Sequence, residues 1–277
     1  MSRRPVHQAH ARVALFGAFA YAAVAALGPL FLGDSPLWPW LELEFARPSR
    51  GALLGRGENG VDVRSALVLG ARTSLIAALA ATILTVALGL LVGALSASAG
   101  RRIDALVLRL LDVLLAFPGI LLAIYLAAVL PPSLPTLVLA LSATGWAGLA
   151  RVVRTRVLEI RAREHVAAAR ALGASPLVLW VRHVLPFVWA PVLVQGSFTL
   201  SAAILAEASL SFLGLGLPPG SPSWGAMLDE GVAYLFVAPH LAITPGACIT
   251  AAALSFHVLG DVLRDRLDVH APRGAAL

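Results

Sequence analysis

The sequence contains no lysine, and all 21 of its basic residues are arginine. A P-loop needs a lysine that reaches the β- and γ-phosphates of a nucleotide, and Schiff-base catalysis needs a lysine amine. The sequence therefore predicts no ATPase site and no Schiff-base enzyme. Cysteine is almost as scarce, since Cys248 is the only one. A single cysteine cannot close a disulfide within the chain, and it excludes a cysteine cluster around zinc or iron and sulfur.

Charge is also scarce: 13% of the 277 residues are charged and 59% are hydrophobic. A soluble globular domain is about a quarter charged, so we expect a membrane protein. The apolar stretches run for about 20 residues at a time, as helices crossing a ~30 Å hydrocarbon core require, and do not alternate as barrel strands do. We predict an all-α, polytopic membrane protein. Its six transmembrane helices are expected at approximately 12–32, 67–97, 106–130, 134–153, 185–213 and 236–260.

The arginines predict the orientation of these spans. If the N-terminus is cytoplasmic, sixteen of the 21 arginines fall in cytoplasmic segments, as the positive-inside rule requires. The first apolar run is longer than the core of a signal peptide and lacks a clean small-x-small cleavage site, so we expect a retained span. The expected partition is a cytoplasmic N-terminus with the first span (1–32), an extracytoplasmic segment (33–66), a main membrane domain (67–262) and a cytoplasmic tail (263–277).

A polar loop of about thirty residues, 154–185, separates the fourth and fifth spans, and we call it the coupling loop. Its alanine-rich stretch 163–172 favours a helix, and Gly173 suits the position that ends one. Ser175 can cap a second helix that has Pro176 at its first position, and Pro186 is expected to break the chain before span five.

The second helix carries an apolar stripe at helical spacing, formed by Leu177, Trp180, Val181 and Val184. Two short helices with an alanine face and basic flanks fit a groove on another protein. An amphipathic loop that lies on anionic lipid is the competing interpretation.

The spacing within this loop resembles a known motif. Ala167-Ala168-Ala169, then Gly173, then His183-Val184-Leu185-Pro186, resembles the EAA loop of bacterial ABC importer permeases, whose pattern is E-A-A-x3-G-x9-I-x-L-P. The stretches 206–216, 222–225 and 111–119 are similar to signatures of the dipeptide and oligopeptide branch, specifically its C-type permease. The resemblance covers roughly residues 54–268.

The resemblance implies a type I ABC importer permease in a bacterial inner membrane, with both termini cytoplasmic. It implies a heterodimer with a second permease, two ATP-binding subunits that use ATP and magnesium, and an extracytoplasmic substrate-binding protein. The bilayer is the remaining partner, and no nucleic acid is expected. The residues expected to dock the ATPase are Glu164, Ala167, Ala168, Ala169, Gly173, Ser175, His183, Leu185 and Pro186.

The sequence departs from the family pattern in two places. Ala167 stands where the loop usually has glutamate, so the ion pair of that carboxylate is either lost or supplied by Glu164 one turn earlier. In the segment 54–63 the family pattern L-G-T-D-x-x-G-R-D-V is altered at Arg56, Gly57 and Val61. Dipeptides, oligopeptides, nickel chelates and glutathione all remain open as cargo.

Three features lie within the apolar spans or at their edges. Glu207 is mid-span, where a charged side chain costs at least ~2.5 kcal/mol, so it either lines a substrate path or makes a buried helix contact. Pro118-Gly119 can break span three along a pathway or simply permit close packing. Asp104 and Asp112 flank Arg109, which predicts a salt-bridge cluster.

Two other classes of function were weighed. An ion-driven secondary transporter needs several intramembrane acids, and only Glu207 lies plainly in mid-span. An intramembrane enzyme needs a catalytic constellation, but His165 and His183 have no carboxylate or serine partner at a suitable spacing. We therefore expect no catalytic residue, no metal site and no cofactor bound by this chain.

Overall fold

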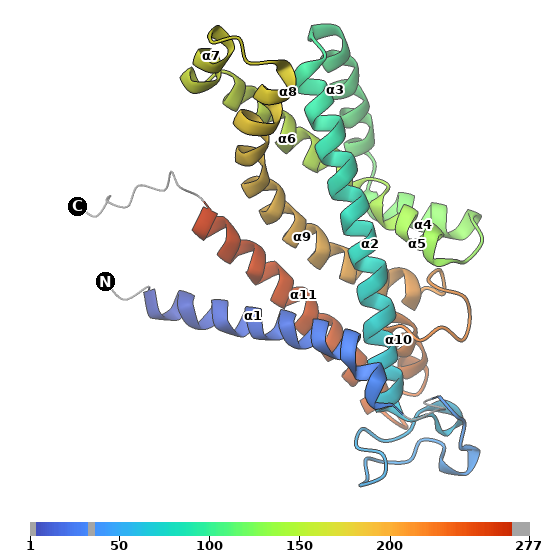
Figure 1. The fold of residues 1–277 in the computed structure, drawn as a ribbon. Coiled ribbons are helices and arrows are strands. Elements are labelled where there is room, and N and C mark those ends of the chain that lie inside the picture. The colour runs from blue at the N-terminus through green and yellow to red at the C-terminus, as the bar shows by residue number, and fades with distance from the viewer. Residues whose placement is uncertain (1–3, 33–36, 268–277) are drawn as a thin grey trace.

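The computed structural model describes residues 4–32 and 37–267 as a bundle of helices (Figure 1). The α-helices are α1 (Arg4–Leu27), α2 (Val63–Ser98), α3 (Arg101–Ala116), α4 (Gly119–Val129), α5 (Leu134–Ser142), α6 (Gly145–Arg161), α7 (Glu164–Ala171), α8 (Pro176–Val178), α9 (Leu185–Phe212), α10 (Trp224–Ala233) and α11 (His240–Leu267). Short 3-10 helices span Gly28–Phe31, Leu41–Leu43 and Glu58–Gly60, and a π-helix spans Leu179–Val184.

The predicted spans are present, although two of them are broken. Four helical segments are long and apolar enough to cross a membrane: Ala11–Phe31, Val63–Ser98, Pro176–Phe212 and His240–Leu267. The pairs α3 with α4 and α5 with α6 supply two more if each bent pair is one span, with bends of 82° and 47°. By length and apolar composition, the described residues therefore contain up to six spans, as the sequence predicts.

Helix α2 runs along most of the length of the bundle and contacts elements at both ends (Figure 1). Its 36 residues are more than one bilayer crossing requires, as expected from the long apolar run 67–97. The coupling loop lies near one end of α2, and residues 37–62 lie near the other (Figure 1). Asp62 caps the start of α2 by accepting hydrogen bonds from the Ser65 amide and hydroxyl, at 3.3 and 2.8 Å.

Small side chains let α2 pack closely against its neighbours. From Ala77 to Ala97 every buried residue of α2 is alanine, glycine, serine or threonine. Gly89 and Gly93 form a G-x-x-x-G pair that faces Leu149, Ala150 and Val153 of α6. A Cβ atom on Gly93 would lie 2.4 Å from the backbone oxygen of Ala150, so only glycine fits there.

The helix bounds differ from the predicted ones in two places. The loop 214–235 contains a helix, α10, which Ser223 caps by accepting a hydrogen bond from the Ala226 amide at 3.2 Å. The last span runs over His240–Leu267 and not 236–260, because its final two turns are polar and extend past the apolar run.

The glycine contact between α2 and α6 yields a testable prediction. We expect Gly93→Ala to destabilise the isolated permease by about 1–3 kcal/mol, because the new methyl meets a backbone atom that cannot move aside. Gly148→Ala on α6 is the matched control, since a Cβ there meets nothing within 4 Å. The measurement is the fraction of monodisperse protein that survives heating in detergent. Equal survival of the two variants would contradict the account of this contact.

Candidate docking site

Helix α7 presents part of the alanine face outward. Ala167 and Ala168 are exposed and Ala169 is half-buried. Val166 is 1% exposed and anchors the helix in an apolar cluster that includes Val157 of α6. Glu164, at the exposed first position of α7, makes none of the ion pairs found among the described residues, so its carboxylate faces solvent.

The turn after α7 forms as predicted. Gly173 has a φ of +81°, the left-handed conformation that favours glycine. The Gly173 amide donates to the oxygen of Arg170 at 3.0 Å, and the Ala174 amide donates to that of Ala169 at 3.1 Å. These two bonds are the Schellman arrangement that ends a helix. Exposed Ser175 then caps α8, its hydroxyl accepting from the Val178 amide at 3.4 Å.

The break predicted at Pro186 is wrong. The chain passes from α8 through the π-helix Leu179–Val184 into α9, so Pro176–Phe212 is one helical run of 37 residues. Pro186 lies in the first turn of α9, where a missing amide hydrogen costs least. The wide π turn absorbs the irregularity. Leu185 and His183 are half-buried and Pro186 is exposed.

The apolar stripe of the second helix is divided between two surfaces. Val184 is buried and Trp180 half-buried, and both line a cavity of about 290 Å³ between the two helices of the loop. Leu177 and Val181 are 72% and 57% exposed, and Leu172 is 88% exposed. The coupling loop therefore exposes apolar side chains among charged ones such as Arg163 and Arg182. Arg161 and Arg170 line the cavity.

His165 and His183 of the coupling loop lie close together. Their ring centroids are 6.2 Å apart, and the His165 ring is 5.4 Å from that of Phe187. Among the described residues no group of three or more histidine, cysteine, aspartate or glutamate side chains could hold a metal ion.

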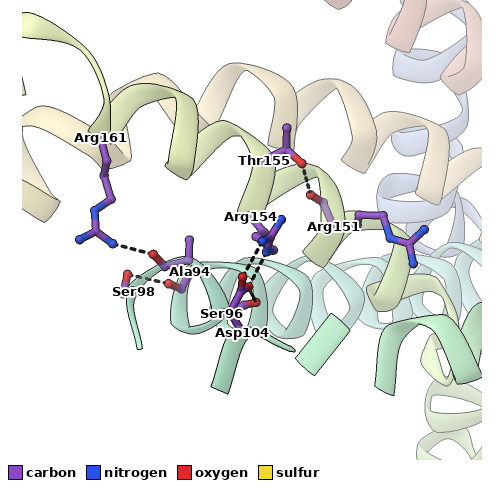
Figure 2. Close-up of polar contacts among 9 residues, drawn as sticks. Ala94, Ser96, Ser98, Asp104, Arg151, Arg154, Thr155 and Arg161 are labelled. Atoms are coloured by element: carbon purple, nitrogen blue, oxygen red, sulfur yellow. Dashed lines mark hydrogen bonds and ion pairs between the residues drawn. The ribbon is translucent and has the colours of Figure 1, made fainter. Parts of the chain in front are cut away.

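Two ion pairs join α3 to α6. Figure 2 shows one of them, between Arg154 and Asp104. Asp104 accepts two hydrogen bonds from the Arg154 guanidinium, and the Ser96 hydroxyl of α2 donates to the same carboxylate at 2.6 Å. Asp112 pairs with Arg151 through one contact. The two aspartates therefore form ion pairs, but not with Arg109, which makes none of these contacts. Their partners are Arg151 and Arg154 of α6, 39 and 50 residues further along the chain.

Glu207 is 1% exposed in the centre of the bundle. Its carboxylate accepts a hydrogen bond from the Ser211 hydroxyl at 2.8 Å, one turn along α9. The adjoining packing includes Trp224 of α10, whose indole nitrogen donates to the oxygen of Leu67 at 2.9 Å and whose ring stacks on Tyr21 at 4.7 Å. The carboxylate thus lies in a helix-packing region, and the pathway role of Glu207 stays a prediction.

Pro118 and Gly119 lie at the 82° bend between α3 and α4. A Cβ on Gly119 would lie 2.6 Å from the hydroxyl oxygen of Thr144, which is in the break between α5 and α6. The two breaks therefore pack against each other, and the predicted kink is confirmed. Whether these residues line a substrate path stays a prediction.

A larger cavity, of about 510 Å³, lies at the opposite end from the coupling loop. Its charged lining residues are Glu58, Asp229 and Glu230. Burial raises the pKa of Glu230, and the nearby carboxylates of Glu58 and Asp229 raise it further. All the charged residues that line this cavity are therefore acidic.

These features define a multi-pass helical membrane protein with a protruding, partly apolar loop at one end. Residues 85–270 match the family described as the binding-protein-dependent transport system inner membrane component. Because that match covers more than half of the sequence, the chain belongs to this family. It is therefore a permease subunit of an ABC importer.

Relatives and a solved structure agree with the family. A protein of Brucella suis biovar 1 named as a peptide transport system permease is 38% identical over 96% of this chain and 90% of its own. The oligopeptide permease OppC of Bacillus subtilis is 37% identical over 80% and 72%, and the di/tripeptide permease DppC of Pseudomonas aeruginosa 38% over 83% and 74%. The fold also resembles the methionine ABC transporter MetNI, with a TM-score of 0.57 at 19% identity, over 73% of this chain and 95% of that one.

The turn within the coupling loop can be tested through its cap. We expect Ser175→Ala to cost about 1 kcal/mol locally and to speed amide hydrogen exchange in residues 176–184, because α8 loses its capping hydroxyl. Ser175→Asp keeps a capping oxygen and serves as the control. Identical exchange rates in the two variants would show that the cap does not order this segment.

Proposed function

We propose that this permease forms half of the translocation pathway for di- or oligopeptides in a bacterial inner membrane. The other half is a second permease, and two ATP-binding subunits dock at the coupling loop. An extracytoplasmic binding protein delivers the cargo. ATP and magnesium are used by the ATP-binding subunits, since this chain has no lysine for a P-loop. The coupling loop and both termini face the cytoplasm, in accord with the positions of the arginines.

The observation that carries the docking proposal is the exposed surface of the coupling loop. Leu172, Leu177 and Val181 project from two short helices whose orientation is fixed by the Gly173 turn. Exposed apolar groups gathered on one loop favour a protein partner. Glu164 lies at the start of α7 on the same loop, where it can supply the carboxylate that Ala167 lacks.

The proposed mechanism is alternating access driven by this contact. ATP closes the pair of nucleotide-binding subunits, the two coupling loops move together, and the spans open outward; hydrolysis resets them. The ATP-bound and nucleotide-free ATP-binding subunits must hold the coupling loop differently. A partner that interacts equally with two conformations does not shift the equilibrium between them.

The relatives' names support peptides as cargo, since they are named for peptide, oligopeptide and di/tripeptide transport. Glutathione, itself a tripeptide, is the second candidate, because the glutathione transport permease GsiD of Pectobacterium atrosepticum is 37% identical over 80% of this chain. The adjacent reading frames and the binding protein that they encode distinguish the two. Thermal-shift titration of that binding protein with dipeptides, longer peptides and glutathione should show stabilisation by peptides. Stabilisation by none of them would refute a peptide cargo.

The docking proposal predicts the effect of substitutions at Gly173. Proline cannot adopt a φ of +81° and lacks the amide that bonds Arg170, so Gly173→Pro should cost about 3 kcal/mol or more in the turn. We expect loss of co-purifying ATP-binding subunits and of ATP-driven uptake into proteoliposomes. Gly173→Asn tolerates the left-handed conformation and should retain both activities. If Gly173→Pro binds the ATP-binding subunits and transports normally, the loop is not the docking element.

A further inference from the structure

The part of the coupling loop that follows α6, residues 162–185, packs against α6. Helix α6 ends at Arg161 and α7 begins three residues later. Val166 and Val184 of the loop are 1% and 2% exposed and belong to the same buried cluster as Val153 and Val157 of α6. A displacement of the loop must therefore displace the adjoining half of α6.

Helix α6 meets the hairpin of α2 and α3 at three levels. Gly89 and Gly93 of α2 touch its first half. At its last turn the Arg161 guanidinium donates to the backbone oxygen of Ala97 at 2.6 Å. Between these levels lies the Arg154–Asp104 pair, which reaches past α2 to α3 (Figure 2).

Besides these contacts, α3 is attached through one apolar cluster, in which its Leu111 packs with Ala147 and Ala150 of α6. Of its sixteen residues, all described, only Leu111 is buried. The helix continues through the 82° bend into α4. Contacts that hold α3 to α6 therefore decide whether the α3–α4 segment follows a movement of α6.

Asp104 is the residue where this attachment converges. It lies in the first turn of α3, and its carboxylate binds Arg154 of α6 and Ser96 of α2. Its side chain is 23% exposed and that of Arg154 is 19% exposed. Two nearly parallel N–H···O bonds fix orientation as well as distance, and partial shelter from water reduces screening.

The neighbouring pair lacks these properties. Arg151 and Asp112 are 46% and 66% exposed and share a single contact. Exposed pairs of this kind contribute about 0–1 kcal/mol. The chain thus provides its own control, an ion pair between the same two helices without a third partner.

We propose that Asp104 is a positioning residue that makes α6, the coupling loop and the α2–α3 hairpin move as one body. The role rests on the proposed docking of ATP-binding subunits at the coupling loop. Without Asp104, the loop and α6 can shift while α3 and α4 stay behind, so ATP-driven movement no longer reaches them.

The test measures a distance within the assembled importer in nanodiscs, with its partner permease and ATP-binding subunits. Spin labels are placed at exposed positions of α3 and the coupling loop, through Arg102→Cys and Arg182→Cys in a Cys248→Ser background. Double electron–electron resonance records the distribution of distances between the two labels, first without nucleotide and then with ATP plus vanadate. One moving body predicts the same distribution in both states.

The variants separate positioning from stability. Asp104→Asn should give a nucleotide-dependent shift of about 2 Å or more, within the range of helix shifts in switching proteins. Asp112→Asn should behave as the unsubstituted protein. The exchange of Asp104→Arg with Arg154→Asp restores an ion pair and should restore the invariant distance, which a loss of packing would not.

Three results would overturn the proposal: a distance that changes without any substitution, a rigid Asp104→Asn variant, or an exchanged pair that stays mobile. If Asp104→Asn does not assemble, the exchanged pair decides alone, and its failure to assemble would assign the ion pair to folding. Co-purification of the ATP-binding subunits is read separately. If the unsubstituted permease does not retain them, the docking proposal fails and the positioning role fails with it; retained subunits with a rigid variant overturn the positioning role alone.

Discussion

Helices α2 and α6 approach so closely that Gly89 and Gly93 cannot carry even a methyl group without displacing atoms of α6. Lipid tails are as apolar as leucine, so helix association in a membrane depends on close packing and on hydrogen bonds more than on hydrophobic burial. The small residues of α2 supply that packing. They fix α6, and α6 in turn holds the coupling loop at the end of the bundle away from residues 37–62 (Figure 1).

Polar contacts hold the remaining part of α6. Where α6 leaves the close glycine contact, it is held by the guanidinium groups of Arg154 and Arg161, which bind α3 and the end of α2 (Figure 2). The apolar surface formed by Leu172, Leu177 and Val181 lies beyond these attachments. Helix α6 thus leads into an exposed apolar surface at its end and makes fixed contacts along its side. A helix that transmits movement from an ATP-binding subunit to the bundle requires both.

Much of this could be predicted from local signals. Helical runs, the left-handed Gly173 and the Ser175 cap depend on neighbouring residues, so sequence alone identifies them. The pairing of Asp104 with Arg154 depends on how two helices 50 residues apart lie together, and no local spacing reveals it. The predicted helix break at Pro186 is wrong because proline interrupts most helices, whereas here the preceding π turn lets α9 continue the helical run from α8. Helix α10 was not predicted because its ten residues, capped by a serine, follow a segment rich in glycine and proline that favours a loop.

Site-specific photo-crosslinking in the assembled importer would identify what covers the coupling loop. A photoreactive amino acid is placed at Leu172, 88% exposed on the loop, and in a second protein at Phe236, which is fully exposed between α10 and α11. We expect mass spectrometry to find the ATP-binding subunit crosslinked at Leu172 and not at Phe236. Crosslinks from Leu172 to lipid alone, or from Phe236 to the ATP-binding subunit, would contradict docking at the coupling loop.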